Sequence, residues 1–279
     1  MSFSVAVDPT NPGQFFACCG LLELADRLWP GAEGWFEDGT FHVSTGDIAT
    51  LIDQLVCLRF VSSLGDDGLK RLGSLLSADK STLTELDKQD KERLRKAWQV
   101  ERVQIPAPFN FWLDWWWDDK SGVTLLKTWA AKQFVLSMAN PMLSALKSLT
   151  WDSSSRENCL QRTAKLSGLP FYFDAANNTQ NTPRDNGFAP GAVKSAPNDR
   201  PLLELLAFVG LQRFRPHRPD KAERILYATW SIPLPPSVAS VAAAGMLNVT
   251  GSRAFEFRML YRTEYMKAFL PAQAVRGVK

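Results

Sequence analysis

The stretch PGQFFACCGLLELADRL, residues 12–28, constrains the fold more than any other part of the chain. The Asn-Pro pair at its start is typical of a helix, because Asn11 can cap the first turn and proline fits the first helical position. Phe15, Phe16 and Leu22 then fall on more than one side of that helix. A helix that is apolar on several sides has to be buried. We therefore expect residues 12–28 to form a buried helix.

Elsewhere, hydrophobic periodicity predicts an α+β fold that combines mixed sheet layers with several helices. Strands are expected at 3–7, 168–176 and 225–232, and a strand pair, or a strand and a helix, at 253–270. A hairpin is expected around Asp38-Gly39, and helices at 48–55 (capped by Asp47), 79–99, 202–213 and 237–245, with a long one at 124–149 that is kinked or broken at Pro141. The helix at 79–99 is mostly charged, so we expect it to lie in solvent.

Residues 109–119, FNFWLDWWWDD, hold four of the ten tryptophans. Strand alternation puts Phe109, Phe111, Leu113, Trp115 and Trp117 on one apolar face, and Asn110, Trp112, Asp114, Trp116 and Asp118 on the other. Three aspartates, at 114, 118 and 119, would make the second face acidic, so it should repel phosphate. We therefore expect Trp112 and Trp116 to contact another protein or domain rather than nucleic acid.

Charge differs between the two halves of the chain. Residues 1–150 contain 15 Lys and Arg against 19 Asp and Glu, a net −4, whereas residues 151–279 contain 17 against 10, a net +7. Twelve of those 17 cations are arginines, whose planar fork suits phosphate and guanine edges. We predict an N-terminal α+β domain at 1–150 with the Trp-rich strand, and a basic C-terminal α+β domain at 151–279. The C-terminal domain contains a long Asn/Pro/Gly-rich loop at 177–201, and we expect it to bind a polyanion.

Motifs of common enzyme classes are absent from the sequence. No catalytic triad spacing, HExxH, paired CxxC, Walker loop or GxGxxG turn is found, so we expect no catalytic residue, no metal and no cofactor. One alternative stays open, a metal-dependent nuclease that uses Asp114, Asp118 and Asp119 as Mg²⁺ ligands. A signal-peptide pattern and an apolar run of about 20 residues are also lacking, and the four cysteines form no CxxC pair, so a cytoplasmic location is expected.

Candidate nucleic-acid contacts cluster in the second half. Amides and cations in or next to the loop 177–201 are the side chains that read base edges; they are Asn178, Asn181, Arg184, Asn186, Lys194 and Arg200. A Pro-broken basic segment follows and should form a phosphate track of Arg213, Arg215, His217, Arg218, Lys221 and Arg224. Arg253, Arg258 and Arg262 add to it if their strand lies alongside.

Three separated blocks resemble a known family. They are NPGQFFACCGLLELADRLWPGAEGWF, FNFWLDWWWDDKSGVTLLKTWAAKQ, and LLELLAFVGLQRFRP followed by YATWSIPLP. Together they resemble the CRISPR-associated protein of subtype I-G (formerly I-U), which we place among the compact Cas eight type large subunits. The resemblance spans residues 8–270 but supplies no residue-level pattern for reading DNA, so the site residues above rest on composition and loop placement.

The resemblance implies a non-catalytic subunit of a crRNA-guided DNA surveillance complex (Cascade) that recognises a protospacer-adjacent motif. Base pairing by the guide reads most of the target, so such a protein needs only a small reading element and a basic channel. The implied partners are crRNA, double-stranded target DNA, Cas seven and Cas five/six type subunits, and a nuclease-helicase of the Cas three type. A crRNA-lining backbone or scaffold subunit with an RRM-like fold is the other binding alternative.

Overall fold

The computed structural model describes residues 1–79, 81–99, 102–117, 126–129, 133–152, 156–178, 198–219, 223–247, 249–261 and 267–275. The fold is of the α+β class, as expected, and its named strands pair antiparallel in small sheets. The chain divides into a larger unit, Met1–Leu58 with Thr128–Lys279, and a smaller unit, Arg59–Lys127. This division differs from the sequence-based boundary at residue 150, because segments from both halves of the chain pack together in the larger unit.

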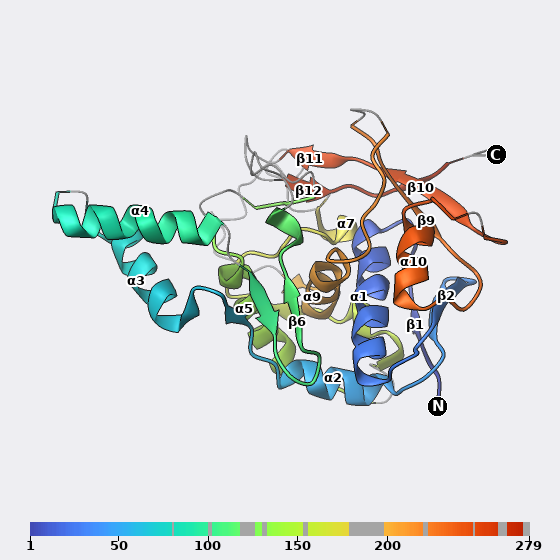
Figure 1. The fold of residues 1–279 in the computed structure, drawn as a ribbon. Helices are drawn as coiled ribbons and strands as arrows, with labels where there is room; N and C mark the ends of the chain where they lie inside the picture. The colour runs from blue at the N-terminus through green and yellow to red at the C-terminus, as the bar shows by residue number, and fades with distance from the viewer. Residues whose placement is uncertain are drawn as a thin grey trace. The chain divides into compact units, whose positions relative to one another are not determined.

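Two helices form the centre of the larger unit (Figure 1). Helix α1 (Pro12–Leu28) is buried from its first residue to Ala25, and every residue of α9 (Pro201–Gly210) is buried. Asn11 caps α1 by accepting the N–H of Gly13 at 3.0 Å, so both the cap and the buried helix expected from the sequence are confirmed.

Glycines bring these two helices into backbone contact. A Cβ on Gly20 of α1 would lie 1.9 Å from the Leu206 carbonyl oxygen of α9, and one on Gly210 would lie 2.1 Å from the Phe16 oxygen. Both distances are far below van der Waals contact, so only glycine permits this approach. The crossing of α1 and α9 therefore depends on two positions without a side chain.

A three-stranded sheet of order β1-β3-β2 packs at one side of α1. Its strands are β1 (Phe3–Ala6), β2 (Gly34–Glu37) and β3 (Thr40–Val43), and helix α2 (Ile48–Val56) follows. The predicted hairpin is confirmed, since Asp38 (φ 43°) and Gly39 (φ 76°) make the left-handed turn that joins β2 to β3. Asp47 caps α2 through the Thr50 N–H, as expected.

The C-terminal part adds a second sheet, of order β13-β10-β9, and a ribbon, β11-β12. The strands are β9 (Ile225–Thr229), β10 (Arg253–Phe257), β11 (Met259–Tyr261), β12 (Lys267–Phe269) and β13 (Gln273–Ala274), and α10 (Pro236–Ala243) follows β9. Aromatic rings join this sheet to α1: Phe15 and Tyr227 have centroids 4.3 Å apart, and Phe16 lies 6.4 Å from Phe257. The largest side chains in this part of the core are thus aromatic.

Two expected elements of the larger unit are corrected. Helix α5 (Leu136–Lys147) is the helical part of 124–149 among the described residues, and it continues through Pro141, so the expected break is wrong, whereas the alternative of a kink stays a prediction. Residues 168–176 form no strand; irregular backbone there leads into α7 (Ala175–Asn178). The short elements η2 (Cys159–Gln161), β7 (Ala164–Lys165) and β8 (Asn198–Asp199) complete this unit.

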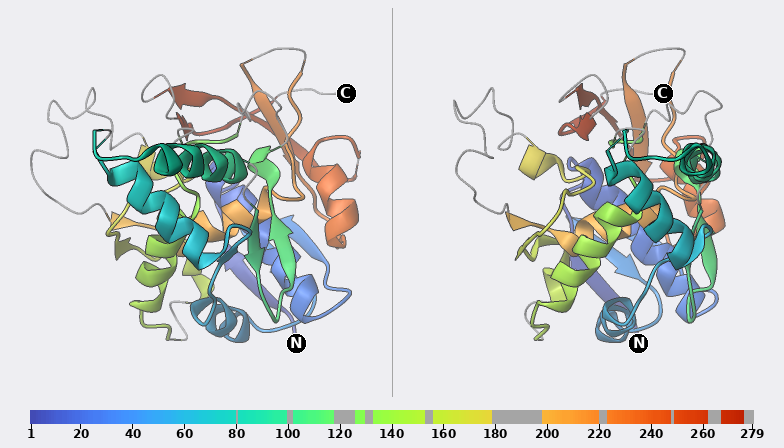
Figure 2. Two further views of the ribbon diagram at one scale, coloured as in Figure 1. Left: turned by 60° about the vertical axis from the view of Figure 1, so that its left-hand side comes forward. Right: turned by 90° about the vertical axis from the view of Figure 1, so that its left-hand side faces the viewer.

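The smaller unit joins a three-stranded sheet to a helical pair. The sheet has order β4-β5-β6, with β4 (Val61–Ser62), β5 (Val103–Ile105) and β6 (Phe111–Leu113). Helices α3 (Gly65–Ser77) and α4 (Glu85–Gln99) lie side by side (Figure 2). Arg71 of α3 bonds Asp87 and Asp90 of α4 at 2.6 and 2.9 Å. The charged segment 79–99 is thus helical from Glu85, whereas α3 was not expected.

The Trp-rich segment departs from strand alternation after Leu113. A 3-10 helix, η1 (Trp115–Trp117), follows β6, and successive side chains there turn by about 120° instead of alternating. Trp115 and Trp116 are both buried, at 1% and 7% exposure, and their rings meet edge to face. The expectation that Trp116 faces outward is therefore wrong. The same expectation for Trp112 is confirmed, because its side chain is 43% exposed. Asp118 and Asp119 lie outside the described residues.

Candidate nucleic-acid interface

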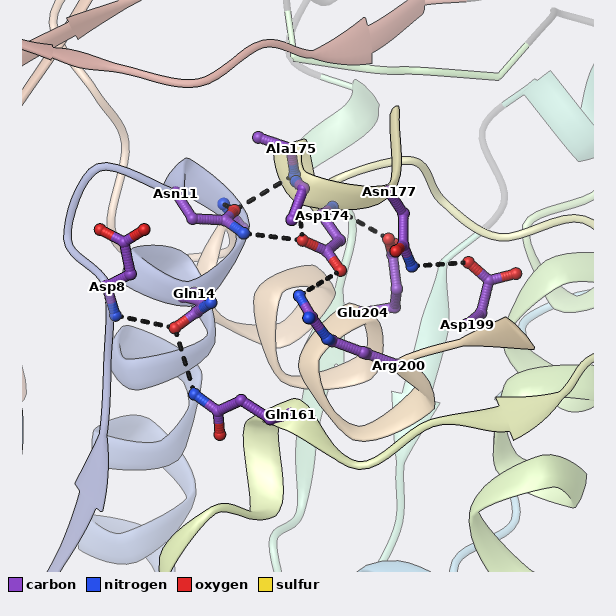
Figure 3. Close-up of polar contacts among 12 residues, drawn as sticks. Asp8, Asn11, Gln14, Gln161, Asp174, Ala175, Asn177, Asp199, Arg200 and Glu204 are labelled. Carbon is purple, nitrogen blue, oxygen red and sulfur yellow. Dashed lines mark hydrogen bonds and ion pairs between the residues drawn. The ribbon is translucent and has the colours of Figure 1, made fainter. Parts of the chain in front are cut away.

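A buried polar cluster lies where the N-terminus of α1 meets α7 and α9 (Figure 3). We call it the polar anchor; its members are Asn11, Asp174, Asn177, Asp199, Arg200 and Glu204. Asp174, Asp199 and Glu204 are each no more than 2% exposed. The guanidinium of Arg200 lies 3.0 Å from an oxygen of Asp174.

The polar anchor holds the irregular backbone that precedes α7. Glu204 accepts the N–H of Phe173 and of Asp174 at 3.1 and 3.0 Å. Asn11 accepts the N–H of Ala175 at 3.2 Å while its amide donates to Asp174 at 2.7 Å. Side chains thus satisfy the donors that a neighbouring strand would satisfy in a sheet. This explains why the apolar stretch 168–176 does not form the expected strand.

The pKa of Glu204 in the polar anchor is strongly perturbed. Burial raises its pKa well above the ordinary value, and the nearby carboxylates of Asp199 and Asp174 raise it further, although two backbone N–H groups act in the opposite direction. A buried carboxyl group beside two others is most stable when it carries its proton. Glu204 therefore keeps its proton to a higher pH than an exposed glutamate does.

The polar anchor also joins the two ends of the span 179–197. Asn177, before the span, donates to Asp199, after it, at 3.5 Å. Arg200 reaches back to Asp174 in the same way. The segments that enter and leave the expected reading loop are thus bonded to each other. The span itself lies outside the described residues.

Two segments with basic residues, from distant parts of the sequence, flank β9 on its two edges. His217 and Leu226 form an antiparallel bridge in which each N–H donates to the other's carbonyl, at 2.9 and 2.8 Å. The β9–β10 register, continued by one residue, sets Arg224 opposite Arg258. β10, which ends just before Arg258, therefore lies beside β9, and β9 separates it from the segment that holds His217. We call the following exposed residues the basic strip: Arg215, His217, Arg218, Arg224 and Arg258.

Arg224 of the basic strip has a carboxylate partner and another acidic residue next to it in sequence. Arg224 Nη1 lies 3.3 Å from Glu256 Oε2, and Glu223 is exposed nearby in sequence. The excess of positive charge on this described surface favours an anionic partner. An exposed ion pair such as Arg224–Glu256 contributes little, so a phosphate can compete with Glu256 for the guanidinium.

Arg213 points to a different partner from the other predicted phosphate contacts. Its Nε lies 2.5 Å from Glu23 Oε2, and the Glu23 carboxylate, 4% exposed, also accepts from Arg27 at 3.0 Å. Hydrogen bonding to Glu23 raises the pKa of Arg213. Because removal of this cation would leave a buried carboxylate poorly compensated, we leave Arg213 out of the basic strip.

Several predicted base-reading residues fall outside the described residues. They are Asn181, Arg184, Asn186 and Lys194, and two residues predicted for the phosphate track, Lys221 and Arg262, also lie outside the description. Asn178 ends α7, and its side chain is also outside the description. Arg200 is described, but its guanidinium is directed inward to Asp174. Sequence reasoning missed the polar anchor; the lone acid Glu204 within the apolar run LLELLAFVG was the available signal.

Other chemistry is limited among the residues that the structure describes. No group of three or more His, Cys, Asp and Glu side chains there is arranged to hold a metal ion. Burial raises the pKa of Cys159 to about 12, and those of Cys18 and Cys19 also rise well above the ordinary value, so these thiols stay protonated. No helix in the described ranges is long and apolar enough to cross a membrane.

Comparison of the chain with protein-family models, with curated proteins and with solved structures found no match. The functional argument therefore rests on the geometry of the polar anchor and the basic strip, and on the residues that carry the sequence resemblance.

Proposed function

We propose that this protein is a non-catalytic, nucleic-acid-binding subunit of a crRNA-guided DNA surveillance complex of the type I class. In that role it contacts target duplex near the protospacer-adjacent motif and assembles with crRNA and with Cas seven and Cas five/six type subunits. The observation that carries the proposal is the arrangement around β9: His217 bridges to Leu226 on one edge, and on the other edge the β10 register, continued by one residue, sets Arg258 opposite Arg224. The three resembling sequence blocks supply the assignment to this class of complex.

The geometry of the basic strip suits a phosphate backbone. Residues on neighbouring strands lie about 5 Å apart, and residues two along a strand lie roughly 7 Å apart. Phosphates follow one another along a nucleic-acid strand at a similar spacing, so several arginines can each meet a different phosphate. Arginine binds phosphate through paired N–H groups, and such contacts position a duplex without reading its sequence. The strip therefore accounts for general affinity, and a separate element has to read the motif.

The test is the salt dependence of duplex binding by the assembled complex. Replacing Arg215, Arg218, Arg224 and Arg258 together with alanine should flatten the slope of log affinity against log salt by about 0.9 for each phosphate that the variant no longer neutralises. An exposed, ion-paired arginine of the smaller unit gives a matched control, since Arg93→Ala removes the Arg93–Asp90 pair and should leave the slope as it is. If the quadruple variant keeps the native slope, the basic strip does not bind the phosphates.

A further inference from the structure

On the outer face of the β4-β5-β6 sheet, the exposed indole of Trp112 lies in the same cross-strand row as the polar side chain of Gln104. Val61 pairs with Gln104, and Gln104 pairs with Trp112, so the three side chains form one row on the same face. Val61 is 37% and Trp112 43% exposed, and Gln104 is half-buried between them. The opposite face is closed by Ser62 and its buried neighbours.

A second row on this face holds a cation. Continuing the β5–β6 register by one residue sets Arg102 opposite Asp114, and their side chains pair at 3.3 Å. Arg102 remains 51% exposed. The aspartate that the sequence placed beside the tryptophan is thus neutralised. The acidic character expected of this face, which argued against nucleic acid, does not hold for its described residues.

Together the two rows present the three groups that single-stranded nucleic acid needs. An indole offers a flat surface for stacking a base, and its neighbour Gln104, with its Cβ about 5 Å away, has an amide that can bond the edge of that base. Arg102 lies two residues from Gln104, roughly 7 Å along the strand, so its guanidinium can reach the adjoining phosphate. A protein partner would use the indole but has no need of this order of groups.

We propose that Trp112, Gln104 and Arg102 form a stacking site for one base of a single-stranded nucleic acid. The site lies in the smaller unit and is independent of the basic strip. Because its cation is already paired with Asp114, stacking rather than charge supplies most of the affinity. The contribution of Trp112 should therefore change little with salt.

The experiment measures binding of the full chain to fluorescein-labelled single strands of about 12 nucleotides, oligo-U and oligo-dT, by fluorescence anisotropy. Trp112→Ala should weaken binding about 5- to 150-fold, by the same factor at about 50 mM and 200 mM salt. Trp112→Phe keeps a stacking ring and should recover most of the affinity. Val61→Ala, in the same row, is the matched control and should bind like the native chain.

Three results would overturn the stacking site. They are no binding of either strand by the native chain, equal affinity of Trp112→Ala and native protein, and equal binding of an abasic strand of the same length and charge. A Trp112→Ala variant that binds single strands normally but no longer associates with purified neighbouring subunits would assign the indole to a protein contact instead. Failure of the basic strip would be seen separately, in the salt slope for duplex.

Discussion

Gly20→Ala tests the packing on which the larger unit is built. The added Cβ would lie 1.9 Å from the Leu206 oxygen and 3.0 Å from the Gly210 nitrogen. To restore even a 3.0 Å approach to Leu206, α1 and α9 have to separate by roughly 1.1 Å, because both clashing groups are backbone and no rotamer relieves them. Overpacking of this kind costs about 3 kcal/mol, against a helix-propensity gain of about 1 kcal/mol from replacing glycine by alanine.

We therefore expect Gly20→Ala to lower the free energy of unfolding of the larger unit by about 2 kcal/mol. Urea unfolding followed by tryptophan fluorescence measures the change. Gly73→Ala in α3 is the matched control, since, among the described residues, its added Cβ would meet no atom within 4 Å beyond its chain neighbours and its own helix backbone. It should stabilise its own unit by up to about 1 kcal/mol. A Gly20→Ala protein that is as stable as the native chain would refute the close helix contact.

Further predictions concern single side chains whose surroundings are described. The raised pKa of Glu204 means that the native protein loses stability as pH rises from about 4.3, its unfolded value, through the folded pKa, with a slope of at most about 1.4 kcal/mol per pH unit. Glu204→Gln should remove that slope, which urea midpoints measured across this pH range would show. If the native protein and the variant have the same slope, the carboxyl group of Glu204 does not contribute to it. Trp116→Ala should lower the free energy of unfolding of the smaller unit by about 3–5 kcal/mol, whereas Trp112→Ala should change it by less than about 0.5 kcal/mol. Hydrogen exchange measures both changes, and equal changes for the two variants would contradict the different burial of the two side chains.

Elements with local signals were predictable from the sequence. The Asn11 cap, the Asp38-Gly39 turn and the Asp47 cap depend on residues within a few positions of one another, and each is confirmed. The apolar pattern of α9 likewise identified a helix, although its described end, Gly210, comes before the expected Arg213. The alternation in 109–119 failed where a turn of 3-10 helix replaced the strand, and nothing in the hydrophobic pattern marks that change.

Long-range polar contacts could not be foreseen. Glu204 reaches the backbone of Phe173, and Arg213 reaches Glu23 across 190 residues of sequence. The stretch 168–176 has the composition of a strand, but Asn11 and Glu204 supply its hydrogen-bond acceptors, so the strand is not needed. Composition alone identified the arginines of the basic strip, whereas the bridge at His217 was needed to bring them together.

The most direct measurement of the proposed function is the composition of the complex purified by a tag on this chain, expressed with its neighbouring genes. The proposal predicts a small RNA of defined length, Cas seven and Cas five/six type subunits, and one copy of this protein for each RNA, quantified by native mass spectrometry. Several copies for each RNA would indicate a backbone subunit. Purification of the chain without RNA and without these subunits would contradict the proposed function.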